Sequence, residues 1–469
     1  MTSRLLNRWR RRPPPESPGD CGPIVVPSKS ADIRSHSLAA PPKPTVPNST
    51  DPISDAATEP ALPYDRLAEV GVPEPLAAAP RVLTTAADLA DVLDEVRQDC
   101  LVGFDTEFVS ESFYRPQLCL LQFATLSRMV CVDPFTCGPL DDFWAVMADP
   151  DITKIVHGGR EELRFCLNAH GRPQNVIDVQ VAQGFLGRSF PMAYKAICQK
   201  TIGVTIDTHE TRTDWSRRPL SPKQIRYALE DVEHLHSIAW HQYQQLDKLD
   251  RLDWAEAEFE RLIDTVESEP ERDNFRKVSG VTRLRGAEVA VVDALHRYRR
   301  EEAERLNKPV KHVLRDDLLI DIARRQPKTV AELFHTRGMN RKFNDDTAAT
   351  VVEVVADALR QPKASWPKLP RPPKAGPGDD TLTKLLAIAL SDRCARLEVA
   401  MSLVGSQSDI QDVVRHHAKH DDAKAPPKLL TGWRKEVCGS LLSDLLDGRV
   451  SVRVGDPKKA DPLTFEVVE

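Results

Sequence analysis

Two acidic residues, Asp105 and Glu107, stand at the end of the apolar run CLVGF, which is typical of a β-strand. Because side chains alternate along a strand, both carboxylates are expected on the same face. Two carboxylates this close repel each other unless a cation lies between them. The pair therefore indicates a metal site, with two solvated turn carboxylates as the alternative.

Two further groups are placed where they can complete such a site. Tyr227 and Asp231 are four residues apart in SPKQIRYALEDVEHL, so they lie on one face of a predicted helix. Glu162 lies in HGGREEL, where a tight turn and a helix start follow the predicted strand KIVH. Open α/β sheets bind ligands at such strand ends. The order and placement of the three groups indicate one shared site.

Four segments, LVGFDTEF, HGGREELRF, NVIDVQVA and TRTDWSRRPLSPKQIRYALEDVEHL, resemble the exonuclease motifs of ribonuclease D, a family of DEDD 3′–5′ exonucleases of the tyrosine subtype. The resemblance covers about residues 80–245 and implies a ribonuclease H-like α/β fold with a mixed sheet. It implies two divalent cations, Mg²⁺ or Mn²⁺, held by four acids beside a tyrosine. These catalytic residues are Asp105, Glu107, Glu162, Tyr227 and Asp231.

Each residue receives a role from this resemblance and from two-metal phosphodiester chemistry. We expect Asp105 to bridge the cations, Glu107 and Asp231 to hold the ion on the nucleophile side, and Glu162 to support the other ion. Tyr227 would orient the attacking water.

Position 162 departs from the family, which usually has Asp there. Glu is longer by one methylene, or about 1.3 to 1.5 Å, so we expect activity to be retained, if weakened. For Asp178 we expect a supporting or helix-capping role rather than metal ligation. For His157 we expect a structural hydrogen bond rather than metal ligation.

The loop before the Tyr227 helix carries Trp215, Arg217 and Arg218. An aromatic face and guanidinium groups suit a single-stranded RNA 3′ end. A packed tryptophan with solvated arginines is the equal alternative.

These residues need a particular set of elements to position them. A helix capped by Thr84 or Thr85 should open the domain, followed by strands over 100–105, 117–125 and 129–133 and, later, over 154–157. Successive strands and then alternating helices and strands indicate a mixed α/β sheet. A long helix is expected from Ser221.

The C-terminal half shows helical spacing of apolar residues, which predicts all-α domains. Residues 283–360 resemble the HRDC domain, usually a nucleic-acid-binding accessory. Its candidate phosphate contacts, with a solvated basic face as the alternative, are Arg297, Arg300 and Lys311, together with Arg299, Lys308 and Arg341. Residues 380–453 resemble a second, diverged copy, in which Trp433 is expected in the core rather than on a base. The last residues are expected to be a frayed tail.

Proline marks the segments between these domains: sixteen of the 37 prolines fall within residues 1–80. The predicted organisation is a disordered Pro/Arg-rich arm at 1–79, an exonuclease domain at 80–250, an HRDC domain at 280–360, a Pro-rich linker at 361–379 and a second HRDC-like helical domain at 380–455.

Composition excludes several protein classes. The 469 residues contain no apolar run of the length that spans a membrane, and no secretory signal is expected from the arginine-rich start. Nine scattered cysteines without a CxxC pair argue against a disulfide framework and a thiolate zinc site. The cytoplasm is the expected compartment. The net charge of −6 is informative only when it is divided along the chain: residues 1–50 and 283–360 are basic and the remainder is acidic. This division is a weak hint of carboxylates concentrated in one part and a polyanion held by another.

Together these features predict a metal-dependent 3′–5′ exoribonuclease that releases nucleoside 5′-monophosphates. The resemblance implies tRNA precursors as substrates, while no residue specifies a tRNA. A DNA 3′–5′ exonuclease is one alternative, because only contacts to the 2′-hydroxyl distinguish the two backbones. A catalytically silent RNA-binding scaffold is the other. The sequence leaves the oligomeric state open.

Overall fold

The computed structural model describes residues 63–70, 81–206, 213–269, 274–339, 345–369, 376–419, 425–459 and 461–468. Most of the predicted arm at 1–79 lies outside these residues, as do Arg341 and the first two residues of the TRTDWS segment. Within the described part, no helix combines the length and apolarity needed to cross a bilayer.

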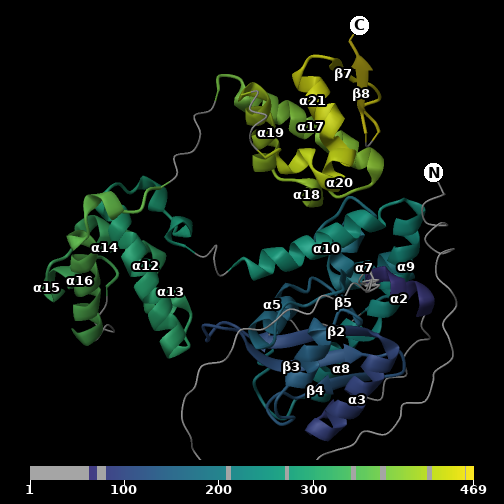
Figure 1. Cartoon of the computed structure of the whole chain (residues 1–469), viewed down its shortest axis with the longest axis horizontal. Helices are drawn as coiled ribbons and strands as arrows, with labels where there is room; N and C mark the ends of the chain where they lie inside the picture. Colours follow the sequence, from purple (N-terminus) through teal and green to yellow (C-terminus); the bar gives the residue numbers. More distant parts are fainter. Residues whose placement is uncertain are drawn as a thin grey trace, which may run out of the picture. The chain divides into compact units, whose positions relative to one another are not determined.

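A six-stranded sheet with strand order β1-β4-β3-β2-β5-β6 organises the exonuclease region (Figure 1). Pairs β2–β3 and β3–β4 are antiparallel, whereas β1–β4, β2–β5 and β5–β6 are parallel, so the predicted mixed sheet is confirmed. The strands are β1 (Val82–Leu83), β2 (Leu101–Val109), β3 (Gln117–Ala124), β4 (Met129–Val132), β5 (Thr153–Val156) and β6 (Val176–Asp178).

Helices cover both faces of this sheet. One face packs on α3 (Ala86–Asp99), α4 (Asp141–Ala148) and α5 (Arg160–Ala169). The other packs on α2 (Pro63–Val70), α6 (Val179–Gly184), α7 (Tyr194–Ile202), α8 (Pro222–Glu233) and α9 (Leu235–Lys248). Helix α10 (Leu252–Glu267) contributes Phe259 to the second core and Ile263 to the first. It begins beyond the predicted domain boundary at 250, yet it belongs to both cores.

Helix α3 forms as its sequence pattern predicts. The Thr85 side chain accepts a hydrogen bond from the Asp88 backbone N–H, which caps the helix start. The four apolar residues at helical spacing are buried against the sheet: Leu89, Val92, Leu93 and Val96.

The predicted long helix from Ser221 is instead two helices. Ser221 and Gln224 form a capping box at the start of α8. At His234 the backbone N–H donates to the Tyr194 hydroxyl at 3.1 Å, and the residue takes φ −109° and ψ 3°. The helix is therefore interrupted between α8 and α9, by a partner on α7 that sequence periodicity does not reveal.

The predicted disordered arm is wrong over helix α2. Tyr64 and Leu67 lie three residues apart on this helix and are 2% and 0% exposed. Both belong to the core on the α8 side of the sheet. Tertiary packing thus orders a short segment that is enclosed by proline-rich sequence.

The next part of the chain is helical around its own core, which includes Leu295 and Leu319. Its elements are η1 (Phe275–Lys277), η2 (Val281–Arg283), α12 (Ala287–Leu306), α13 (Val310–Val313), α14 (Asp316–Arg325), α15 (Val330–Phe334), α16 (Asp345–Arg360) and η3 (Lys363–Ser365). Arg299 is buried and pairs with Asp316 at 2.6 Å, so its prediction as a phosphate contact is wrong.

The C-terminal part contains α17 (Asp379–Leu397), α18 (Met401–Val404), α19 (Gln407–Lys419), η4 (Lys428–Leu430), α20 (Gly432–Arg434), η5 (Lys435–Gly439) and α21 (Ser440–Leu446). The predicted frayed tail is wrong, because β7 (Val450–Val454) pairs with β8 (Leu463–Val467) as an antiparallel hairpin. Both strands alternate apolar and polar residues, and the pairing sets Val452 opposite Phe465.

A buried ion pair joins this part to helix α10. Arg434 donates to both carboxylate oxygens of Glu258, at 2.8 and 2.9 Å, and the Trp433 indole donates to the same carboxylate at 3.3 Å. Glu258 is 1% exposed. The Trp433 ring stacks on Trp254 with centroids 5.7 Å apart. Trp433 is thus a core residue, as expected, and the contact joins two regions of the chain into one core.

Replacing Arg434 by Met should lower the free energy of unfolding by about 1.5 to 3 kcal/mol, because it removes charge-assisted hydrogen bonds from the buried Glu258, which keeps Arg261 and Trp433 as partners. Urea denaturation of the full chain measures this loss. Arg449→Met is the matched control, since its pair with Asp444 is exposed and worth about 0 to 1 kcal/mol. Equal, small losses for both variants would contradict a buried pair.

Candidate active site

Strand β2 presents Asp105 and Glu107 on the sheet face that packs against α8. Leu101, four residues before Asp105 and on the same face of the strand, lies in the core on this side, whereas Phe104 lies in the opposite core. The register with β3 is regular through Glu107 and shifts between Glu107 and Phe108. Both carboxylates therefore sit where the regular pairing of a central strand ends.

Helix α8 brings the other two residues to this place. Ala228, Leu229 and Val232 are buried against the sheet and fix the helix. Tyr227 and Asp231 lie four residues apart, and the Tyr227 hydroxyl is hydrogen-bonded to the Asp231 carboxylate. Helix α8 therefore places a carboxylate and a phenol hydroxyl side by side.

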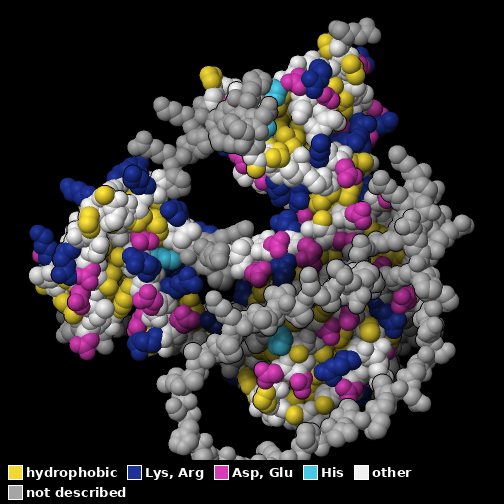
Figure 2. All heavy atoms as spheres, in the orientation of Figure 1, with side chains coloured by type: hydrophobic (Ala, Val, Ile, Leu, Met, Phe, Trp, Pro, Cys, Tyr) yellow, Lys and Arg dark blue, Asp and Glu magenta, His cyan; other side chains and the backbone are white. Residues whose placement is uncertain are grey.

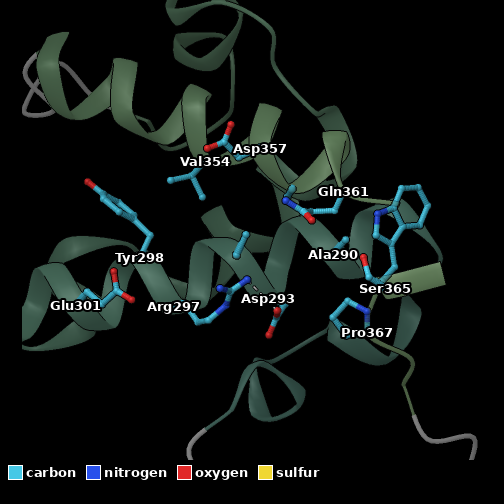
Figure 3. A pocket seen from close by; sticks show the side chains of 13 residues that line it. Ala290, Asp293, Arg297, Tyr298, Glu301, Val354, Asp357, Gln361, Ser365 and Pro367 are labelled. Carbon is cyan, nitrogen blue, oxygen red and sulfur yellow. Dashed lines mark hydrogen bonds and ion pairs between the residues drawn. The ribbon is translucent and has the colours of Figure 1, made fainter. Parts of the chain in front are cut away.

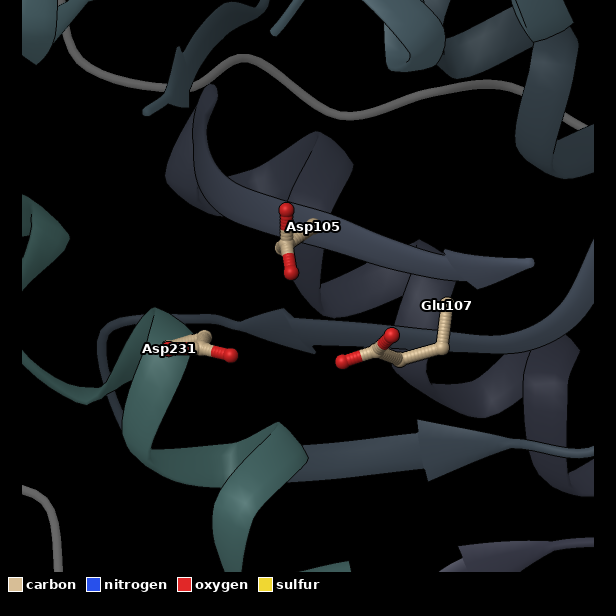
Figure 4. A group of neighbouring side chains, drawn as sticks. All are labelled: Asp105, Glu107 and Asp231. Carbon is tan, nitrogen blue, oxygen red and sulfur yellow. The ribbon is translucent and has the colours of Figure 1, made fainter. Parts of the chain in front are cut away.

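The three carboxylates converge, as Figure 4 shows. One oxygen from each of Asp105, Glu107 and Asp231 lies within 4.8 Å of the others. Burial, together with the charges of Asp105, Asp231 and Glu162, raises the pKa of Glu107 to about 9. Burial also raises the pKa values of Asp105 and Asp231, and for Asp105 the Asp231 charge adds to the effect. At neutral pH the cluster binds protons that a cation must replace.

This donor set fits a hard divalent cation. Carboxylate oxygens are the ligands that Mg²⁺ and Mn²⁺ prefer. No Lys or Arg salt bridge reaches these three carboxylates among the residues that the structure describes. Their mutual repulsion is therefore compensated by protons in the metal-free state and by a cation in the bound state.

Glu162 lies close to the cluster but does not join it. The residue is in the first turn of α5, is 4% exposed and accepts a hydrogen bond from the Thr106 hydroxyl. Thr106 points to the α5 side of β2, opposite Asp105 and Glu107. Burial and then the Asp105 charge raise the pKa of Glu162. Three of the four predicted acids are thus brought together, and the fourth is coupled to them through charge.

Trp215 and its neighbouring arginines occupy the loop before α8. Trp215 is 5% exposed and its ring lies 6.2 Å from that of Tyr227, so it packs behind the phenol. Arg218 donates to Asp133 through two nitrogens, at 2.6 and 2.9 Å, and to the Cys119 and Trp215 carbonyls. Arg217 has an 84% exposed side chain and pairs with Asp214.

Two polar residues behind the site have the supporting roles that their sequence positions predict. Asp178 caps α6 by accepting from the backbone N–H groups of Gln180 and Val181, and it accepts from Gly158 and Gly159 as well. The Nε2 atom of His157 lies 2.9 Å from the Met192 carbonyl oxygen. Both side chains serve the fold beside the site.

The predicted phosphate contacts of the first helical part lie on α12 and α13. Arg297 is exposed, Arg300 is partly buried, and Lys311 is exposed. Arg297 pairs with Asp293 at 3.3 Å. In this region Figure 2 shows basic and acidic side chains interspersed on the visible face.

A cavity of about 580 Å³ lies beside Arg297, between α12, α16 and residues 365–367 (Figure 3). Its lining combines the aromatic rings of Tyr298 and Trp366 with the carboxylates of Asp293, Glu301 and Asp357. It is separate from the carboxylate cluster on β2 and α8.

Two polar side chains at the site are absent from the sequence prediction. Gln122, on β3, donates to Asp105 at 2.8 Å, and Thr106 donates to Glu162. The available signal for Gln122 is a polar residue inside the apolar run QLCLLQFA. The signal for Thr106 is its place between the two acids of β2.

Comparison with known proteins agrees with this geometry. A 3′–5′ exonuclease family model matches residues 80–247, and an HRDC domain model matches residues 288–355. A ribonuclease D of Gluconacetobacter diazotrophicus is 32% identical over 83% of this chain and 97% of its own length. The ribonuclease D of Escherichia coli is 30% identical over 78% of this chain and 98% of its own length.

A solved structure has a similar fold. The crystal structure of Escherichia coli RNase D, described as an exoribonuclease involved in structured RNA processing, superposes with a TM-score of 0.70 at 28% identity, over 78% of this chain and 98% of that one. These matches favour an exoribonuclease over the DNA exonuclease and silent scaffold alternatives. With its acidic cluster, exonuclease domain and HRDC domain, the chain belongs to the ribonuclease D family of 3′–5′ exoribonucleases.

Proposed function

We propose that this exoribonuclease trims the 3′ ends of tRNA precursors and releases nucleoside 5′-monophosphates, using two divalent cations held by Asp105, Glu107, Glu162 and Asp231. The observation that carries the catalytic part is the convergence of three partly buried carboxylates within 4.8 Å beside a tyrosine. Divalent metal dependence follows from this cluster in a 3′–5′ exonuclease domain. The tRNA substrate rests on family membership.

Each residue of the site has its own role at the reacting phosphate. When bound, Mg²⁺ or Mn²⁺ acidifies the attacking water and stabilises the departing 3′ oxygen. Asp105 would hold both cations, Glu107 and Asp231 the one on the nucleophile side, and Glu162 the other. The Thr106 hydrogen bond keeps the longer Glu162 side chain beside Asp105.

Tyr227 orients the attacking water rather than deprotonating it. Burial and the charges of Asp231, Glu107 and Asp105 raise the pKa of its phenol, so the hydroxyl stays protonated at neutral pH. The hydroxyl donates a hydrogen bond to Asp231 and keeps an oxygen lone pair that can accept a hydrogen bond from water. The Trp215 ring behind it restricts the phenol to this direction.

RNA is the partner of this family of enzymes, and we propose the contacts that guide its 3′ end. Arg217 extends from the loop before α8, and Arg297, Arg300 and Lys311 lie on the HRDC helices. Trp215 and Arg218 support the site from behind, because the ring is buried and the guanidinium is bound to Asp133. Trp215 therefore fits the packed alternative, whereas Arg218 is ion-paired with Asp133 rather than solvated.

We propose that the predicted domains are functional units. In this proposal residues 380–455 form a second HRDC-like module, in addition to the HRDC domain that is matched at residues 288–355. The helices α17 to α21 support this assignment. A cytoplasmic location is proposed as well. It is supported by the eight described cysteines, which are all free thiols.

Tyr227→Phe should lower kcat by about 100-fold or more while RNA affinity changes little, because only the water-orienting hydroxyl is lost. Single-turnover kinetics with a 3′-tailed tRNA give the rate, and filter binding in Ca²⁺ gives the affinity. Equal losses in rate and affinity would refute the water-orienting role.

Glu162→Gln should lower turnover by about 10- to 100-fold, as expected when a carboxylate that supports a metal site becomes neutral. Glu161→Gln is the matched control, because the neighbouring Glu161 pairs with Arg164 on the helix surface. Wild-type turnover in Glu162→Gln would remove this residue from the proposed ligands.

A timed digestion tests the whole proposal. A tRNA precursor with a 3′ extension should lose nucleotides one at a time in Mg²⁺ or Mn²⁺, stop in EDTA, and remain intact with Asp105→Asn. Chromatography of the products identifies nucleoside 5′-monophosphates, and a matched DNA strand measures backbone selectivity. Equal rates on an unrelated single-stranded RNA and on the precursor would argue against tRNA as the specific substrate.

A further inference from the structure

We propose that Gln122 is a positioning residue that orients the Asp105 carboxylate for cation binding. The inference rests on the proposed metal site and concerns a residue outside the predicted set of ligands. In this proposal Gln122 acts through Asp105 and does not itself contact RNA or metal.

The sheet register places the two side chains together. Asp105 on β2 and Gln122 on β3 are direct cross-strand partners, so their side chains are neighbours on one face of the sheet. The Gln122 amide nitrogen donates to Asp105 Oδ2 at 2.8 Å. A one-residue slip of β3 would turn Gln122 to the other face and break this contact.

The burial of Gln122 needs a reason. The side chain is 0% exposed on a strand whose neighbours on the same face, Leu120 and Ala124, are apolar. Burying an amide without full hydrogen bonding costs about 1 to 3 kcal/mol by protein mutational data. Its Oε1 atom has no hydrogen-bond partner in the described structure. An apolar residue would stabilise this position better, so the amide is retained for what it does to Asp105.

Chemistry fixes the direction of the amide. An ionised carboxylate only accepts hydrogen bonds, so the NH₂ end of Gln122 must face Asp105 and the carbonyl end must face away. The opposite orientation would set an amide oxygen against a carboxylate oxygen. The direction of the bond therefore holds in the ionised, cation-binding state of Asp105.

One hydrogen bond of this kind leaves Asp105 able to bind cations. A carboxylate has about four lone-pair positions, and Gln122 uses one of them at Oδ2. Asp105 also accepts a hydrogen bond from the Thr106 backbone, and one of its oxygens lies within 4.8 Å of an oxygen of Glu107 and of Asp231, as Figure 4 shows. Supporting hydrogen bonds of this type change metal affinity or activity by about 10- to 100-fold when they are removed.

Gln122→Met tests this role, because Met keeps the volume and removes the donor. In metal-free, full-length protein without RNA, titration with Mn²⁺ followed by electron paramagnetic resonance should show about 10-fold weaker binding than in wild type. Turnover should fall at low Mn²⁺ and recover at high Mn²⁺, with KM for RNA unchanged.

Gln242→Met is the matched control. Gln242 is also 0% exposed with an unpartnered Oε1 atom, but its amide donates to Val179 and Gln183 on α6. This variant should keep wild-type Mn²⁺ affinity even if its melting temperature falls. If Gln122→Met does not fold, Gln122→Asn retracts the amide by about 1.5 Å and should weaken Mn²⁺ binding as well.

The outcomes separate the two proposals. Wild-type Mn²⁺ affinity in the folded Gln122 variant would overturn the positioning role while leaving the metal site intact. Absence of Mn²⁺ binding by the wild-type chain would instead overturn the metal assignment. An equal loss of affinity in the Gln242 variant would show that the effect is a general one of core disruption, and this too would overturn the positioning role.

Discussion

The repulsion among the partly buried carboxylates of β2 and α8 is the constraint on which the site depends. Asp105, Glu107 and Asp231 come from two elements, yet their oxygens meet within 4.8 Å. Such an arrangement is unfavourable in isolation, because burial and like charge both oppose ionisation. It persists because β2 is held between β3 and β5, and because the apolar face of α8 fixes Asp231. The folded chain therefore has a preformed site that favours cation binding.

Strand β2 serves this site from both of its faces. Asp105 receives a hydrogen bond from Gln122 on the α8 side, and Thr106 donates to Glu162 on the α5 side. Consecutive residues of one strand are thus tied to β3 and to α5. This explains how Glu162 can remain near the cluster even though its helix packs on the opposite face of the sheet. The extra methylene of Glu is directed towards Thr106 rather than into the group of three.

Much of the active site was predictable from the sequence, because the positions of its residues depend on short-range periodicity. Strand alternation placed Asp105 and Glu107 on one face, and helical spacing placed Tyr227 beside Asp231. The order of the predicted strands and helices gave the mixed sheet, which the strand pairing confirms. The family resemblance supplied the exonuclease and HRDC domains, which the comparisons confirm.

What the sequence did not reveal depends on distant partners. The interruption at His234 requires the Tyr194 hydroxyl, forty residues away. The contact between Gln122 and Asp105 requires the register of two strands. The order of α2 requires a core built from later helices. Local propensity carries no information about such contacts, so they appear only when the chain is folded.

Helix α10 has a consequence for how mutations act in this gene. The helix contributes to the cores on both faces of the catalytic sheet, and its Glu258 is neutralised by Arg434 from near the end of the chain. A premature stop codon between the end of α10 and Trp433 would preserve every acidic residue of the nuclease in the reading frame. It would nevertheless remove the Arg434 and Trp433 partners of Glu258 and uncover the Trp254 ring on α10. Truncated alleles should therefore behave as loss-of-function alleles through misfolding, with intact catalytic chemistry encoded in an unstable chain.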